Sequence, residues 1–393
     1  MDLSQTFAVA DERYIWGIDL DERQAILCRE RVAGAVWSRT VSVRAVAQLL
    51  ETDAAGARAH FAALGHREAQ EPWHRWERPI QWARRKGQRK LAINLISHDN
   101  GVGLTQDQRL LRALLEREGH EVHYCEWRNM SSAADINIYL ELFETKHLQT
   151  ARSHIGIFNL EWYDKYAVGH LRSMTQCWAK SMEAARIYDQ VGGVRGIYTG
   201  FLSRDMRRRV PQRERTCLHV RGKASQKATD VVLEAWRRHG DYLPRLIVTA
   251  AEEFDGWRNT HEDVEVRFGF MKENELATLM SRCWFHVCPS EAEGWGHYIA
   301  EGLSSEAVVT TVDASPMNEH VQPAWGVLLP GKPVAQGLVT RHRADPDDLA
   351  NAILKLEELD DAELGAMGAR ARDHWEARQA SFTERALALL SQV

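Results

Sequence analysis

Short apolar runs alternate with amphipathic stretches from residue 91 onward. The run Leu91–Ser97 is apolar almost throughout, as expected of a parallel strand buried on both faces. The stretch after it has Leu111, Leu114 and Leu115 at helical spacing. Similar runs predict strands over Val122–Trp127, Asp135–Leu140 and His154–Asn159, and then over Cys217–Val220, Leu246–Thr249, Val264–Phe268, Trp284–Cys288 and Val308–Val312. Strands that alternate with helices in this way predict a doubly wound α/β fold.

Helix start and stop signals divide this part of the chain further. Thr105 with Gln108 three residues later has the capping-box pattern, and Gly119 is typical of a helix end. Further helices are expected over Val231–Arg238, Glu273–Ser281, Asp345–Leu359, Asp361–Ala377 and Ser381–Leu390. We therefore predict two Rossmann-like domains, over residues 91–212 and 213–376, followed by a C-terminal segment over residues 377–393.

Residues 1–90 show a different pattern of apolar and polar positions. Helix-like stretches are expected at roughly 21–37, 42–51 and 54–65, so we predict a small helical extension that packs as an appendage. A helix-turn-helix domain is the alternative interpretation. Residues 71–90 then carry seven basic residues and three tryptophans, which suits either a solvated linker or a patch that binds an acceptor or nucleic acid by stacking and phosphate pairing.

Composition limits the function classes. The chain has 393 residues with a formal net charge of −5, which argues against a protein whose whole surface binds nucleic acid or anionic lipid. No stretch approaches the ~20 apolar residues of a membrane helix, and the N-terminus lacks a signal-peptide pattern. The six cysteines are scattered, as in a reduced cytosolic protein, so we expect a cytoplasmic location.

The segment PSEAEGWGHYIAEGLSS, residues 289–305, combines features of an anion site. It follows a predicted strand and carries two carboxylates, Glu293 and Glu301, with Gly294 and Gly296 after the first. Glycines let backbone amides approach a ligand, and a helix that begins near Gly296 would favour a phosphate at its N-terminus. Glu301 would then lie in the second helical turn, where a carboxylate can accept hydrogen bonds from a ribose diol.

Two other loops are expected at the same sheet edge. In Gly222-Lys223-Ala-Ser-Gln-Lys227, the two lysines lie about one turn apart and can neutralise a diphosphate. Cations aimed at the charge that develops on a departing diphosphate are a large catalytic term, and they can replace a metal ion. Asn318 and Glu319, which follow the run VVTTV, could cap a phosphate or bind a sugar hydroxyl.

Together these residues resemble the retaining glycosyltransferases of family 4 (glycosyl transferases group 1), which have the GT-B fold. The family's Pro-Ser strand end and E-x7-E motif read here as Pro289-Ser290 and Glu293…Glu301. Its Gly-Arg…Lys-Gly loop is similar to Gly222-Lys223…Lys227-Ala228, with Lys for Arg, Ala for the second Gly and a spacing one residue shorter. The resemblance covers residues 91–393 and is strongest from residue 215.

The resemblance implies two Rossmann-like domains that face a cleft, with a UDP- or GDP-sugar bound to the second. Glu301 would hold the ribose, Glu293 the sugar, and Lys223 and Lys227 the diphosphate; the amides of Gly294, Trp295 and Gly296 would contact phosphate or sugar. The last helix would cross back to the first domain. The residues expected on the acceptor side are His98, Asn100, Gly101 and Gly103 in the first glycine-rich turn, and Asn159 or Glu161 in place of a histidine common in the family.

No metal site or cofactor is expected. Asp19-Leu-Asp21 matches the DxD pattern of a metal motif. It begins a predicted helix, however, where acidic residues act as caps. The main hypothesis is thus a metal-independent retaining glycosyltransferase with an unidentified glycan, lipid-linked or small-molecule acceptor. The alternatives are transfer to a modified DNA base through residues 1–90, and a protein that binds a sugar nucleotide or DNA without catalysis.

Overall fold

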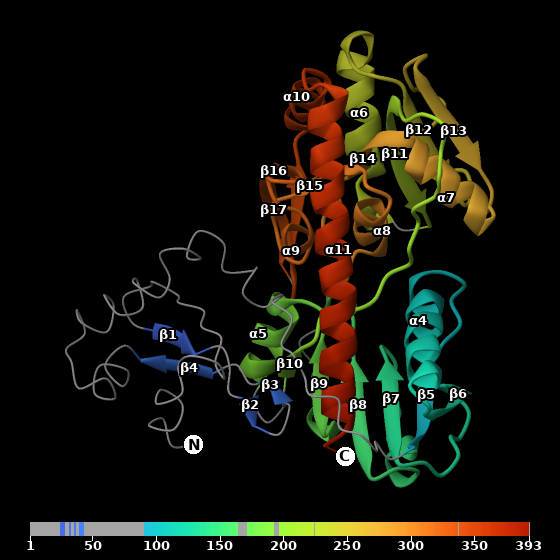
Figure 1. Cartoon of the computed structure of the whole chain (residues 1–393), viewed down its shortest axis with the longest axis vertical. Coiled ribbons are helices and arrows are strands. Elements are labelled where there is room, and N and C mark those ends of the chain that lie inside the picture. The colour runs from blue at the N-terminus through green and yellow to red at the C-terminus, as the bar shows by residue number, and fades with distance from the viewer. Residues whose placement is uncertain are drawn as a thin grey trace. The chain divides into compact units, whose positions relative to one another are not determined.

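The computed structural model describes residues 90–163, 171–191, 196–223, 225–336 and 338–392, together with four short strands before residue 43 (Figure 1). Contacts divide the chain into two compact units. One comprises residues 90–196 and 200–379, and contains the candidate site. The other comprises residues 1–89, 197–199 and 380–393.

The helix predicted over residues 21–37 is wrong, because strands occupy this stretch. They are β1 (Gln24–Leu27), β2 (Arg31–Val32), β3 (Ala35–Val36) and β4 (Arg39–Ser42). β1 pairs antiparallel with β4, and β2 with β3. The β-branched residues in VAGAVWSRTV favour strands, which the helical spacing alone did not reveal. The helices predicted at 42–51 and 54–65, the Asp19–Asp21 motif and the basic segment up to residue 89 lie outside the described residues.

The first of two large sheets has the strand order β10-β9-β8-β7-β5-β6. Strands β5 to β9 pair in parallel, so that their carboxyl ends share one edge. The bounds are β5 (Ala92–Ser97), α4 (Gly103–Arg117), β6 (Glu121–Glu126), β7 (Ile136–Leu140), β8 (Ser153–Ile157), β9 (Gln176–Ala179), α5 (Met182–Val191) and β10 (Gly196–Tyr198). The three strands predicted to follow β5 are confirmed within a few residues, whereas β9, α5 and β10 were not predicted.

The predicted capping box of α4 is wrong. The helix begins at Gly103 after the N-cap Val102, so Thr105 lies inside the first turn. Its hydroxyl oxygen instead accepts a hydrogen bond from the Gly101 amide at 2.8 Å. The side chain of Thr105 thereby stabilises the turn before the helix.

The second sheet has the order β13-β12-β11-β14-β15-β16, the 3-2-1-4-5-6 arrangement of dinucleotide-binding folds. All neighbouring strands in it are parallel. The elements are β11 (Glu214–Gly222), α6 (Thr229–His239), β12 (Leu246–Ala250), β13 (Val264–Phe268), α7 (Glu273–Arg282), β14 (Cys283–Cys288), α8 (His297–Ser304), β15 (Val308–Val312), α9 (Met317–His320), β16 (Gly326–Leu329) and α10 (Pro346–Glu357). The prediction of two doubly wound domains is confirmed.

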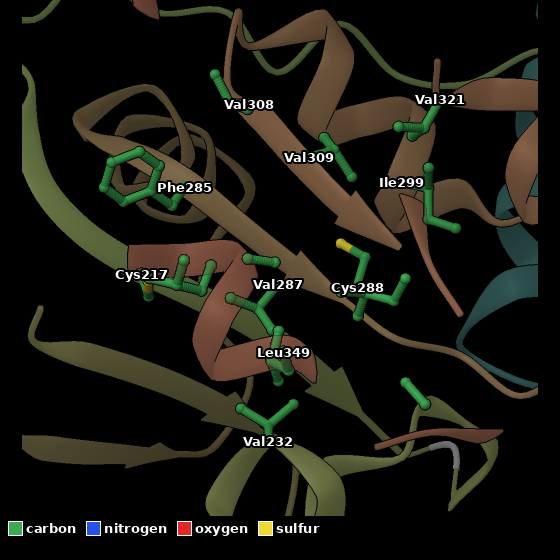
Figure 2. Close-up of a cluster of buried hydrophobic side chains, with 14 of the residues drawn as sticks. Cys217, Val232, Phe285, Val287, Cys288, Ile299, Val308, Val309, Val321 and Leu349 are labelled. Atoms are coloured by element: carbon green, nitrogen blue, oxygen red, sulfur yellow. The ribbon is translucent and has the colours of Figure 1, made fainter. Parts of the chain in front are cut away.

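Apolar side chains cover both faces of the second sheet. Along β11, Cys217 packs in a large cluster with α6 and α10, whereas its neighbour Leu218 packs in a smaller cluster with α7. Figure 2 draws side chains of the large cluster, among them Val232 of α6, Val287 of β14 and Leu349 of α10. Since successive side chains of a strand point to opposite faces, a sheet covered on both sides needs the unbroken apolar runs seen in the sequence.

Two further features complete the second half. An antiparallel hairpin, β17 (Gly331–Gln336) with β18 (Thr340–Ala344), follows β16. The C-terminal helix α11 runs without interruption over Asp361–Leu390, where two helices were predicted. The boundary predicted between residues 376 and 377 falls within this helix. No helix in the described residues is long and apolar enough to cross a membrane.

Candidate functional site

Strand order places two loops of the second sheet side by side. Neighbouring β11 and β14 are the strands between which the order reverses, and ligands of open α/β sheets bind outside the carboxyl ends of such strands. The loop after β11 carries Lys227, and the loop after β14 carries Glu293. The Glu291 amide donates a hydrogen bond to the Gln226 carbonyl at 2.9 Å, so the two loops are tied together.

Glu293 is held in place by its own loop. Ser290 Oγ donates a hydrogen bond to Glu293 Oε1 at 2.6 Å, and lies 2.5 Å from the Tyr298 hydroxyl on α8. Burial raises the pKa of Glu293, while Lys227, Ser290 and His297 favour its ionised form. Gly296 ends the loop with a φ of 88°, a backbone conformation that favours glycine, and α8 starts directly after it.

Lys227 faces inward beneath this loop. Its Nζ donates a hydrogen bond to the Val220 carbonyl at 2.8 Å and lies 4.0 Å from the ring centroid of Tyr298. Burial lowers the pKa of Lys227, and the nearby Glu293 and Glu301 oppose that shift. A lysine held among carboxylates in this way is a cation available to a bound anion.

Gly222 and Lys223 lie at the outer side of the same loop. Gly222 has a φ of 60°, and a Cβ there would lie 3.8 Å from Lys227 Nζ. Lys223 is exposed, with its Nζ 5.5 Å from the ring centroid of Phe270. Among the described residues, therefore, Lys227 rather than Lys223 lies close enough to Glu293 to feel its charge.

Glu301 lies in the second turn of α8, as predicted, and is only 4% exposed. Arg204, in the segment that joins the two sheets, donates a hydrogen bond from Nε to Glu301 Oε1 at 2.7 Å. Burial lowers the pKa of Arg204, but its ion pairs with Glu301 and Glu273 outweigh burial and raise it. Arg204 lies in no sequence motif and was not predicted.

Polar residues also gather at the edge of the first sheet. Glu141 follows β7, Asn159 lies just beyond β8, and Lys180 follows β9. Asn159 Nδ2 donates a hydrogen bond to Glu141 Oε2, and Lys180 Nζ donates one to Asn159 Oδ1, both at 2.8 Å. Lys180 Nζ also donates to Asp107 Oδ2 at 2.5 Å, and both side chains of that pair are 2% exposed.

Asp107, in α4, joins this network to the second sheet. Its Oδ1 accepts a hydrogen bond from His297 Nε2 at 2.6 Å, and His297 is the first residue of α8. Burial raises the pKa of Asp107, but the charges of Lys180 and His297 and their hydrogen bonds outweigh it, so that the pKa is lowered. The carboxylate is therefore ionised and uses both of its oxygens.

Glu161 approaches the Glu293 loop from the first sheet. A Cβ at Gly294 would lie 2.7 Å from Glu161 Oε1 and 2.4 Å from Asn159 Oδ1, so a larger residue there would displace these two side chains. Burial, with Glu293 adding to it, raises the pKa of Glu161 to about 8. Its Oε2 is buried and has no hydrogen-bond partner among the described residues.

Glu319 and Asn318, on α9, lie in different surroundings. Both carboxylate oxygens of Glu319 accept hydrogen bonds from the Met182 amide at the start of α5, at 2.9 and 3.0 Å. Glu319 thus caps a helix of the first sheet, and burial raises its pKa. Asn318 Nδ2 donates a hydrogen bond to Asp313 Oδ1 at 2.9 Å.

Some predicted residues contact neither Glu293 nor Lys227. His98 pairs with Glu126 at 2.9 Å, and the Asn100 side chain accepts a hydrogen bond from the Val102 amide at 3.0 Å. The turn with Gly101 and Gly103 leads into α4, and the Gly101 amide donates hydrogen bonds to the side chains of Asp99 and Thr105 within this turn and helix start.

Trp295 packs inward instead of presenting its ring at the loop surface. It is 3% exposed, with its ring centroid 4.4 Å from that of His320 and 4.8 Å from the Arg378 guanidinium carbon. The position favours a packing role for the side chain, while its main chain remains part of the loop. Within the described residues, no group of three or more His, Cys, Asp or Glu side chains is arranged to hold a metal ion.

Part of the chain matches a known protein family. Residues 210–374 match the family model described as glycosyl transferases group 1. The sequence matches no curated protein. The matched segment contains β11 to α10, and hence Lys227, Glu293 and Glu301.

Solved structures with a similar fold cover about three quarters of the chain. HepE from Anabaena, solved with UDP and glucose, has a TM-score of 0.57 at 14% identity, covering 77% of this chain and 100% of that one. Sucrose-phosphate synthase from Thermosynechococcus elongatus has a TM-score of 0.56 at 15% identity, covering 77% of this chain and 97% of that one. A glycosyltransferase from Rickettsia africae ESF-5 has a TM-score of 0.58 at 11% identity, covering 77% of this chain and 98% of that one. These likenesses confirm the predicted GT-B fold.

Proposed function

We propose that this chain is a metal-independent, retaining glycosyltransferase that uses a nucleoside diphosphate sugar. The observation that carries the proposal is the junction of the loops after β11 and β14, where Lys227 and Glu293 meet beside Glu301. This junction lies within the segment that matches the group 1 family model. HepE, with the same fold, was solved in complexes with UDP and with UDP-glucose, which supports a UDP-sugar as the first donor to test.

Each residue of the junction has a role in this proposal. Glu301, oriented by Arg204, accepts hydrogen bonds from the ribose, and the carboxylate of Glu293 binds donor sugar hydroxyls. The amides of residues 294–296 contact sugar or phosphate. Lys227 and Lys223 neutralise the diphosphate, which matters most when the bond to the sugar breaks and negative charge develops on the leaving group.

The first sheet supplies the side that faces the acceptor. Glu161 and Asn159 already contact Gly294, so they lie where a sugar bound to the Glu293 loop would be reached. The domains over residues 91–212 and 213–376 would close over the donor and exclude water, so that transfer outcompetes hydrolysis. With no protein nucleophile assigned, retention implies attack from the face that the diphosphate leaves, and the departing phosphate accepts the acceptor's proton.

The test starts from donor binding. A thermal-shift panel of UDP, GDP, ADP and their sugars should raise the melting temperature for one base, because a ligand that binds only the folded state stabilises it by mass action. Glu301→Ala should abolish that shift. The anomeric configuration of the product, read by NMR, then tests retention, and an inverted product would refute this part of the proposal.

Nucleic acid as acceptor has no comparable support. The basic segment that would bind it lies largely outside the described residues, and the relatives named above do not indicate it. A DNA-base acceptor is therefore not proposed.

A further inference from the structure

Of the two ring nitrogens of His297, one is hydrogen-bonded and the other has no partner among the described residues. Its Nε2 donates to Asp107 Oδ1 at 2.6 Å. Its Nδ1 is buried and has no hydrogen-bond partner among the described residues. A buried polar atom without a partner is costly, and in a functional loop it indicates a group that a ligand completes.

Asp107 determines which nitrogen of His297 can change its protonation. Lys180 and His297 both donate to the Asp107 carboxylate, and together they keep it ionised. An ionised carboxylate only accepts hydrogen bonds, so Nε2 carries a proton in both charge states of the ring. Nδ1 is then the atom that gains or loses a proton.

The charged groups around the ring come from several elements. Asp107 lies on α4, Lys180 follows β9, Glu293 precedes α8, and His320 lies on α9. The Phe201 ring meets the imidazole edge-on, with centroids 6.4 Å apart. Of these groups His320 carries no charge, because burial lowers its pKa.

We propose that His297 is a donor-binding residue whose Nδ1–H donates a hydrogen bond to the diphosphate, and that Asp107 positions it. The inference rests on the proposed function, since it names a further contact of the same site. His297 begins α8, directly after the Gly296 turn, and its charge acts on Glu293, so the ring lies close to the loop where the diphosphate would bind. Because Asp107 belongs to the first sheet, diphosphate binding would be coupled to the contact between the two sheets.

The test uses His297→Gln, which separates the two sides of the ring. The glutamine amide can reach the position of Nε2 and still donate to Asp107, but it has nothing at the position of Nδ1. The probe is UDP, or whichever of UDP, GDP and ADP binds the wild type, measured by calorimetry at about pH 5.5 and about pH 8.5, below and above the imidazole range. Comparison with the wild type at each pH cancels the phosphate's own ionisation and that of Glu161.

At about pH 5.5 we expect His297→Gln to bind the nucleotide roughly 10-fold more weakly than the wild type, and at about pH 8.5 within about twofold. Turnover at neutral pH should fall by about 10²-fold, the usual effect of removing one donor to a developing charge. Equal affinity and turnover in both proteins would overturn the inference and leave the proposed function standing. A wild type that binds no nucleoside diphosphate would overturn the proposed function itself.

A second variant tests the positioning role of Asp107. Asp107→Asn is combined with Lys180→Gln, so that no buried ammonium loses its partner. Without the carboxylate nothing orients the ring, so adding His297→Gln to this double variant should change nucleotide affinity at about pH 5.5 by less than about twofold. A residue that only supported the fold would change stability and leave the roughly 10-fold effect of His297→Gln intact, so an intact effect contradicts the assignment.

Discussion

Replacement of Glu161 by glutamine should make the protein more stable. In the folded chain burial raises the pKa of this carboxyl to about 8, against an ordinary value of 4.5. Between these two pH values the unfolded chain releases the proton and the folded chain keeps it. The contribution of Glu161 to the free energy of unfolding therefore falls as the pH rises from about 4.5 to about 8, and is constant on either side of this window.

The magnitude follows from the shift. Each pKa unit is worth about 1.4 kcal/mol, so at pH 7 the cost to the wild type is roughly 3 kcal/mol. Glutamine has the shape of the protonated acid and does not ionise. Partial opening of the contact at Gly294 would hydrate the carboxylate and reduce the cost, so we expect Glu161→Gln to stabilise the protein by about 1–3 kcal/mol at pH 7. At pH 4 the two proteins should be equally stable.

The assay is urea unfolding at pH 4, 5.5, 7 and 8.5. Glu262→Gln is the matched control, since Glu262 is exposed in a loop and its replacement should change the free energy by less than about 0.5 kcal/mol at every pH. Glu183, whose pKa burial raises to about 7, contributes equally to both proteins. A Glu161→Gln protein with the same pH slope as the wild type, or one destabilised at all pH values, would refute the reasoning.

Three further outcomes test other parts of the site. Glu301→Ala should weaken UDP binding at least about 10-fold by calorimetry, with little loss of stability because Arg204 is partly exposed; unchanged affinity would contradict the ribose role. Lys227→Ala should lower the rate of nucleotide release during turnover by about 10²–10³-fold, and a near-normal rate would exclude it as the main diphosphate cation. Glu319→Ala removes the acceptor of the Met182 amide and should cost about 0.5–2 kcal/mol in urea unfolding, whereas no change would mean that water replaces this cap.

The second half of the chain could be predicted well because its signals are contiguous in sequence. Glu293 and Glu301 lie in one loop and the helix after it, and Lys227 is separated from them by ordinary α/β units. Parallel strands buried on both faces leave unbroken apolar runs, so the strand ends, and the loops beyond them, could be located. The strand order that brings these loops together is the common one for such folds.

Beyond Asn159 and Glu161, the polar residues of the first sheet could not be found in this way. Asp107 occupies an ordinary polar position of an amphipathic helix, and Glu141 and Lys180 are single residues at strand ends about 40 positions apart. None of these residues lies in a recognisable sequence motif, and only the tertiary fold joins them by hydrogen bonds. A weak signal did exist, since Glu141 and Lys180 both directly follow apolar strands whose carboxyl ends share one edge.

Two buried polar atoms without partners among the described residues lie where the proposed function would bring the donor sugar and its diphosphate together. Glu161 Oε2 and His297 Nδ1 come from different sheets, and the charge of Glu293 acts on both groups. An unpaired buried polar atom costs about 1–3 kcal/mol, which a ligand that supplies the missing hydrogen bonds recovers on binding. In the proposed function a nucleotide sugar supplies both partners, since a sugar hydroxyl can donate to Glu161 Oε2 while a phosphate oxygen accepts from His297 Nδ1.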